Sequence, residues 1–205
     1  MIFLDLKNTD VKTVYKLMIG AIVPRPIAFI STVSPNAITN LAPFSFFNGV
    51  SSSPACLSVA ITRKPDGSKK DTLINIEKTG EFVVNITTES MVAAVNQASA
   101  PYDYEISEFE KTALTPLASR FVKPPRVKQS PIHFECKTYK TVEIGNGEVG
   151  SAVLVIGEIV ATHIDESVYQ EGKILLEQLH PLSRLGGLSY GRTTELCELP
   201  RPKVE

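Results

Sequence analysis

The chain has 205 residues, and its 21 lysine and arginine residues nearly balance its 22 aspartate and glutamate residues. This balance excludes a broad basic field for nucleic acid and an acidic tail, while the length allows one domain with a substantial core. Three widely spaced cysteines, Cys56, Cys136 and Cys197, form no CxxC pair. We therefore expect reduced thiols, with neither a disulfide framework nor a metal cluster.

The N-terminus and the apolar stretches indicate a cytoplasmic protein. MIFLDLKN has no basic region before its short apolar run and meets Asp5 early, which is atypical of a signal peptide. The longest apolar stretch, SAVLVIGEIV, contains Glu158 and is too short to span a bilayer. We expect no membrane partner.

The first elements in chain order are a helix and a strand. Thr9 or Asp10 can cap a helix over 11–20, which Gly20 would end. The prolines around PIAFISTV bound a continuous β-prone run, which predicts a buried strand. Arg25 lies just before it, and a surface salt bridge is favoured for this residue over a place in a ligand cleft.

The segment from Asn40 to Pro54 mixes small and hydroxyl residues with Pro43 and Gly49, which interrupt any long regular element. Such a segment leaves backbone N–H and C=O groups free for a ligand with a polar edge, such as a flavin ring. The neighbouring Phe44, Phe46 and Phe47 can pack on such a ring or in the core.

A strand, CLSVAITR, and the loop KPDGSKK then lead into a helix, DTLINIEKT, with Asp71 or Thr72 as N-cap and Gly80 past its last turn. Exposed amides at a helix start attract anions, and Lys69 and Lys70 would strengthen the attraction, so a phosphate monoester fits there. A solvated loop with an ordinary cap is the alternative, and spacing alone favours it.

Beyond this helix, FVVNIT predicts a strand and SMVAAVNQAS a helix. From Pro101 to Pro131 the chain turns irregular, with Ser107 and Glu110 as a candidate capping box for one helical turn. So long an excursion is either a lid beside the ligand or a packing arm.

Two long strands follow, IHFECKTYKTVE and SAVLVIGEIVATHI. The glycines between them, Gly145, Gly147 and Gly150, match GxGxxG, but a dinucleotide site needs a helix after that motif. Here a strand lies on each side and Asn146 precedes Gly147, which predicts a hairpin turn.

The remaining motifs give no hydrolytic or metal chemistry. No histidine stands in a metal-binding pair such as HExxH, and neither a GxSxG elbow nor a P-loop is present. The tail, HPLSRLGGLSYGR, either packs over the core or brings Arg184, Tyr190 and Arg192 to a ligand.

Four segments, in order, resemble the flavin reductase-like proteins of the FMN-binding split barrel class. They are IGAIVPRPIAFISTVSPNAITNLAPFSFFNGVSSSP, KDTLINI, TGEFVVNI and LHPLSRLGGLSYGR, and the resemblance extends from Val11 to Gly191. It implies a mainly β fold, a Greek-key split barrel with appended helices. We expect a single domain over 1–205, with its barrel core at about 20–165 and a C-terminal arm at about 166–205.

The resemblance also implies an FMN site. The segment matching Asn40 to Phe46 lies along the flavin ring and ribityl chain in that family, and a second group lies near the phosphate. The cofactor-binding residues expected here are Thr32, Asn40, Ala42, Pro43, Phe44, Ser45, Asn48, Arg63, Lys69, Lys70, Asp71 and Thr72. No residue is assigned as catalytic or as a metal ligand.

The activity implied is electron transfer from NAD(P)H through FMN to a small acceptor, such as free flavin, an iron chelate or a quinone. The partners implied are a nicotinamide nucleotide, the acceptor and a second copy of the chain. A homodimer is favoured independently, because PIAFISTV and SAVLVIGEIV are apolar on both faces.

Two other functions stay open at this stage. One is an FMN-carrying electron-transfer protein of the flavoredoxin type, reduced by a protein partner. The other is a barrel that has lost its cofactor, although the loop with Lys69 and Lys70 gives no sign of that loss.

Overall fold

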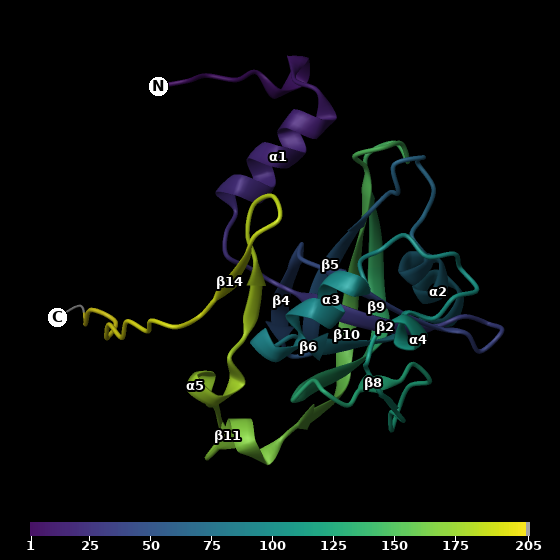
Figure 1. Ribbon diagram of the computed structural model, residues 1–205. Helices are drawn as coiled ribbons and strands as arrows, with labels where there is room; N and C mark the ends of the chain where they lie inside the picture. Colours follow the sequence, from purple (N-terminus) through teal and green to yellow (C-terminus); the bar gives the residue numbers. More distant parts are fainter. Residues whose placement is uncertain (204–205) are drawn as a thin grey trace.

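The protein is described here from a computed structural model, which covers residues 1–203 (Figure 1). One antiparallel sheet of seven strands, in the order β3-β2-β6-β9-β10-β5-β4, forms its centre. The strands are β1 Arg25–Pro26, β2 Ala28–Val33, β3 Thr39–Phe44, β4 Phe47–Ser52, β5 Ala55–Thr62, β6 Glu81–Ile86, β7 Pro116–Leu117, β8 Arg126–Val127, β9 Ile132–Ile144, β10 Ala152–Ile164, β11 Tyr169–Gln170, β12 Lys173–Ile174, β13 Leu182–Arg184 and β14 Tyr190–Arg192.

The helices are short, and all but α1 lie close to the sheets. They are α1 Val11–Ala21, α2 Asp71–Thr79, α3 Val92–Gln97, α4 Glu108–Lys111 and α5 Leu176–Leu179, with 3-10 turns η1 Leu6–Asn8, η2 Glu89–Met91 and η3 Glu166–Val168. The strands predicted before residue 165 and the helix DTLINIEKT are confirmed. No helix within residues 1–203 is long and apolar enough to cross a membrane.

The sheet curls into a barrel because its two edge strands are neighbours in the chain. Only Ser45 and Phe46 separate β3 from β4, and the Ala60 N–H of β5 donates to the Phe46 carbonyl at 2.8 Å. As predicted, no long regular element spans 40–54: the segment forms two six-residue edge strands. An edge strand leaves one row of backbone N–H and C=O groups unpaired, so the accessible backbone expected there comes from strand edges and not from turns.

The barrel is filled from inside by one apolar cluster, which α2 closes at one end with Leu73 and Ile76. Ala28 and Ile30 of β2 point into this cluster, while Phe29 packs on the other face against residues of α3 and α4. The chain's own helices therefore cover the second face of β2, and that strand no longer argues for a partner.

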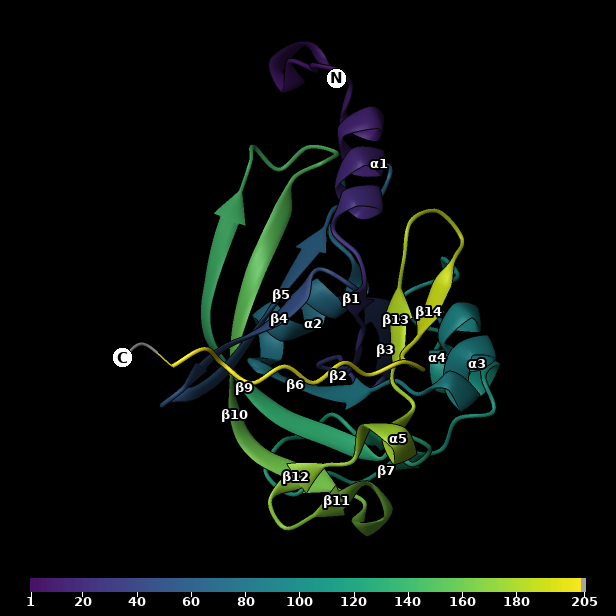
Figure 2. The same ribbon diagram turned by 90° about the vertical axis from the view of Figure 1, so that its left-hand side faces the viewer.

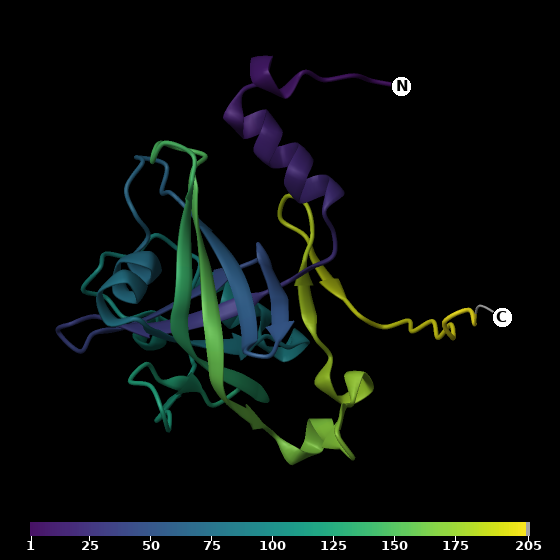
Figure 3. The ribbon, with the colours of Figure 1, turned by 180° about the vertical axis from the view of Figure 1, so that it is seen from behind.

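Strands β9 and β10 form a long hairpin that runs the height of the barrel (Figure 3). Gly145, Gly147 and Gly150 at its tip have φ of 94°, 89° and 95°, a left-handed conformation that glycine adopts without strain. The GxGxxG motif is a hairpin turn, as predicted.

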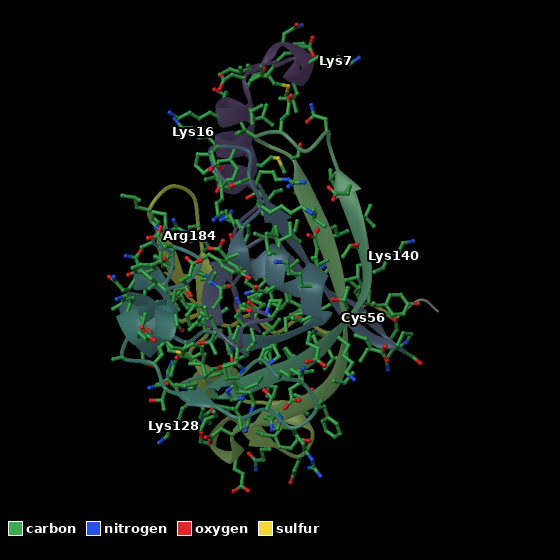
Figure 4. All side chains as sticks on the ribbon, turned by 90° about the vertical axis from the view of Figure 1, so that its right-hand side faces the viewer. Lys7, Lys16, Cys56, Lys128, Lys140 and Arg184 are labelled. Carbon is green, nitrogen blue, oxygen red and sulfur yellow. The ribbon has the colours of Figure 1, made fainter. Side chains whose placement is uncertain are left out.

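Helix α1 projects away from the barrel, and Figure 4 shows Lys7 and Lys16 on this projection. Asp10 caps it by accepting from the Thr13 N–H at 2.9 Å, and none of its residues is buried. In the tail, β13 pairs with β1 and with β14, and this small sheet lies below the base of α1 (Figure 2). Arg25 stands opposite Arg184 in that pairing.

Candidate functional site

The start of α2 is a helix end without a side-chain cap. Lys70 occupies the N-cap position and makes no capping hydrogen bond, so the prediction of Asp71 or Thr72 as cap is wrong. Asp71 instead accepts from Lys64 Nζ at 2.9 Å, and Thr72 Oγ1 donates to Asn40 Oδ1 at 2.7 Å. The amides of Asp71, Thr72 and Leu73 thus have no acceptor within the described chain, which is the arrangement that attracts anions.

Asn40 is the centre of a buried polar network that ties α2 to the sheet. Its Oδ1 accepts from Thr72 and, at 3.2 Å, from Thr32 Oγ1 of β2. Asn75 of α2 closes the ring by donating to Thr32 Oγ1 at 3.0 Å. All four side chains are buried. Since these groups bind one another, three of the expected cofactor residues, Thr32, Asn40 and Thr72, act together in the structure to fix the position of the helix end.

The excursion after Pro101 clamps this network from outside. Glu108 accepts from Asn40 Nδ2 at 2.9 and 3.0 Å and from the Leu41 N–H at 2.7 Å, and Tyr104 donates to Asn75 Oδ1 at 2.7 Å. Burial raises the pKa of the Glu108 carboxyl above its usual range, while the Leu41 and Asn40 donors oppose that shift. At Glu108 the excursion is a packing arm.

The predicted capping box of this arm is wrong. Ser107 stands at the N-cap of α4 but makes no side-chain cap; its hydroxyl bonds Thr39 Oγ1 at 2.6 Å. Glu108, Tyr104 and Asn75 were not identified from the sequence, because no motif marks them and their partners are distant in the chain.

The basic residues expected near a phosphate divide into three arrangements. Lys70 lies with its Nζ 5.6 Å from the centre of the Phe44 ring, and burial, with a contribution from Lys64, lowers its pKa. Lys69 instead pairs with Glu77 at 2.7 Å. Arg63 is largely buried at the end of β5, with Nη2 3.5 Å from Glu143 and an Nε that has no hydrogen-bond partner. An unsatisfied buried donor of this kind fits an anionic ligand.

The corner between β3 and β4 holds the rest of the expected site. Phe44 is buried in the core, Ala42 and Pro43 are half-buried on β3, and Asn48 is exposed on β4. Proline is tolerated in β3 because the strand is an edge. Ser45 accepts from Arg25 Nε at 3.2 Å, and Lys70 above Phe44 links this corner to the start of α2.

Arg25 itself contradicts the expectation of a surface salt bridge. It is 4 % exposed, and its guanidinium donates to Ser45 and to three main-chain carbonyls. No sequence signal marked this buried arginine, because its partners Ser45 and Leu185 are distant in the chain.

The curled antiparallel barrel, open at its edge strands, is a split barrel. The model of the flavin reductase like domain matches residues 19–182 of this chain. The chain belongs to this family, and the mainly β split-barrel fold expected from the sequence is confirmed.

Solved structures and a sequence relative agree with this assignment. Component B of nitrilotriacetate monooxygenase from Bacillus cereus superposes with a TM-score of 0.93 and 38% identity, over 97% of this chain and 98% of that one. The 2-nitrobenzoate 2-nitroreductase NbaA of Pseudomonas fluorescens gives 0.87 and 30%, over 98% and 96%. An uncharacterized protein of Halalkalibacterium halodurans is 41% identical over 93% of this chain and 91% of its own length.

The Glu108 clamp can be tested without any ligand. In Glu108→Gln, one acceptor oxygen becomes an amide donor facing the Asn40 amide or the Leu41 N–H, and we expect the free energy of unfolding to fall by about 1–3 kcal/mol. Urea denaturation measures this loss. Glu110→Gln in the same helix, where the side chain is exposed, is the matched control and should change stability little. Equal effects of the two substitutions would contradict the clamp.

Proposed function

We propose that this protein is an FMN-binding flavin reductase, which passes electrons from NAD(P)H through bound flavin to a small acceptor. The observation that carries the proposal is the uncapped start of α2 beside the edge-strand corner at Ser45. The start of α2 would hold the anionic phosphate of FMN, and the edge-strand corner would lie along its planar ring. Family membership supports flavin chemistry, and the choice of FMN and of a small acceptor is our own.

We assign the phosphate to the free amides of Asp71, Thr72 and Leu73, with Lys70 and the unpaired Arg63 Nε supplying positive charge. Thr32, Asn40 and the Thr72 hydroxyl hold this end of the helix in place from behind. At the rim of this anion site, Lys69 pairs with Glu77, and the Asp71 carboxylate pairs with Lys64.

We assign the flavin ring to the β3–β4 corner, along Ala42, Pro43, Ser45 and Asn48. A bound flavin would supply the hydride acceptor and the electron donor. The chain's part is to orient the ring with unpaired backbone groups and the Ser45 hydroxyl, and to leave one face open for the nicotinamide and then for the acceptor. No proton-transfer side chain is required for this role.

Visible absorption and rapid mixing test the function. We expect the protein purified with FMN to be yellow, to release FMN on denaturation, and to be reduced by NADH or NADPH in stopped-flow mixing. Turnover should follow when free flavin, an iron chelate or a quinone is added. A protein that neither binds FMN nor gains thermal stability from it would refute the proposal. Bound FMN that nicotinamides leave oxidised would favour an electron carrier.

The half-buried Lys70 gives the FMN affinity a pH dependence. Because its pKa is lowered, the side chain loses its charge at a lower pH than a free lysine, so FMN affinity should fall as the pH rises towards 10.5, the ordinary lysine value. Lys70→Met should weaken FMN binding about tenfold, the size of one charge-assisted hydrogen bond, and remove this pH dependence.

Fluorescence titration measures both effects. Riboflavin, which lacks the phosphate, serves as the ligand control, and its affinity should be the same in wild type and Lys70→Met. Lys78→Met, at the exposed end of α2, is the matched protein control. Equal losses for riboflavin and FMN would place Lys70 away from the phosphate.

We also propose a homodimer, and α1 supports it. Val11, Tyr15, Leu17 and Met18 are between 42% and 53% exposed on a helix with no buried residue. A monomer seldom presents so much apolar surface on one projecting element. A second copy of the chain, related by a two-fold axis, would cover this apolar surface.

Light scattering tests this dimer. At micromolar concentration we expect twice the chain mass of 22.4 kDa for wild type. The double substitution Leu17→Lys and Met18→Lys should give a monomer, whereas Lys16→Ala on the same helix should not. A wild-type monomer would rule the dimer out.

A further inference from the structure

Arg25 carries a buried positive charge that no carboxylate neutralises within the described residues. Its Nη1 donates to the Ile19 and Ile22 carbonyls, both at 2.6 Å, and Nη2 donates to the Leu185 carbonyl at 3.0 Å. Its Nε donates to Ser45 Oγ at 3.2 Å. Every acceptor is therefore a neutral dipole, and the side chain is only 4 % exposed.

Such a charge is expensive to bury, because neutral dipoles replace only part of its hydration. Burial lowers the pKa of Arg25, yet arginine keeps its proton in proteins because its ordinary pKa is so high. The cation consequently stays in place, where water screens its field less than at the protein surface. A single substitution of Arg25 removes this charge.

The field acts next to Ser45. Because Ser45 Oγ accepts from Arg25 Nε, its own O–H is turned away from the guanidinium, and that proton has no acceptor among the described residues. The hydroxyl is thus available as a donor at the corner between β3 and β4, where the proposed function puts the edge of the flavin ring. A donor and a cation behind it form a pair that favours negative charge on whatever lies against the corner.

We propose that Arg25 is a positioning residue that makes the bound flavin easier to reduce, by orienting the Ser45 hydroxyl towards the ring and by placing an uncompensated cation behind it. This inference rests on the proposed function. A hydride brings two electrons and one proton, so a neutral oxidised ring that accepts one gains a net negative charge, and the nicotinamide that loses it becomes a cation. Arg25 stabilises the first of these products.

The same guanidinium joins the flavin corner to two other parts of the fold. Ile19 and Ile22 belong to the last turn of α1 and the residue after it, and Leu185 follows β13 in the tail. Arg25 can therefore affect stability as well as the flavin. A test must separate the two effects, and the oxidation state of the flavin does so.

The experiment compares the Kd of oxidised FMN with that of FMN reduced anaerobically, and measures the midpoint potential against a reference dye. In Arg25→Gln we expect affinity for reduced FMN to fall about tenfold more than affinity for oxidised FMN, a shift of about 30 mV to more negative potential for a two-electron couple. Arg25→Lys keeps the charge, and its ratio of the two Kd values should stay within about threefold of the wild-type ratio.

Two further variants complete the test. Ser45→Ala removes the hydroxyl and keeps the charge, so its potential should move in the same direction by less. Arg192→Gln, an exposed arginine of the same tail that pairs with Glu89, should leave the potential unchanged. Circular dichroism and urea denaturation confirm that each variant is folded. If Arg25→Gln does not fold, the ratio of the Kd values for oxidised and reduced FMN in Arg25→Lys and Ser45→Ala decides the question.

An unchanged ratio in folded Arg25→Gln, or an unchanged ratio in Ser45→Ala if that variant must decide, overturns the inference and leaves the proposed function intact. An equally large shift in Arg25→Lys and Arg25→Gln overturns the electrostatic part. Failure of the proposed function looks different: wild-type protein would then bind neither oxidised nor reduced FMN.

Discussion

The hydrogen bonds of the Asn40 side chain are the constraint on which the rest of this site depends. Its oxygen accepts from hydroxyls of β2 and α2, and its amide nitrogen donates to the carboxylate of Glu108. Asn75 of α2 makes a similar connection, to Thr32 of β2 and to Tyr104 of the excursion. Because the Thr72 hydroxyl is used inside the network, it does not cap α2, and the amides at the helix start stay available. A network that is fully satisfied in a buried place holds one arrangement, since each lost bond leaves an unpaired polar group.

Strand β3 lies between two buried charges of opposite sign. Glu108 binds its start at Asn40 and Leu41, and Arg25 binds Ser45 just beyond its end. Both charges are held by neutral donors or acceptors and not by an ion pair. A strand at the edge of a sheet is paired on one side only and is otherwise free to move. Charged groups at both ends can hold its unpaired backbone in one position, as the proposed flavin site requires.

The proposed redox function does not require a triad or a metal motif among the described residues of the site. In the proposed function the hard chemistry would belong to the cofactor, and the chain would supply an anion site, a backbone edge and a buried positive charge. The excursion that follows α3 fits the same account. Within it, Tyr104 binds Asn75 of α2 and Glu108 binds Asn40 of β3.

The sequence by itself determined the local elements and the family. DTLINIEKT has a turn-forming loop before it and a glycine after it, and α2 spans those nine residues; NG between two β-prone runs fixed the β9–β10 hairpin. The segment-by-segment resemblance was sufficient to identify the split barrel.

What only the tertiary structure decided are the partners of polar groups. Asn40 and Glu108 are 68 residues apart, and Arg25 and Leu185 are 160 apart. Local pattern cannot pair such residues, because their contact exists only once distant segments of the chain have packed together. For the same reason the caps of α2 and α4 were misjudged: Thr72 and Ser107 have a better partner across the fold than in their own helices.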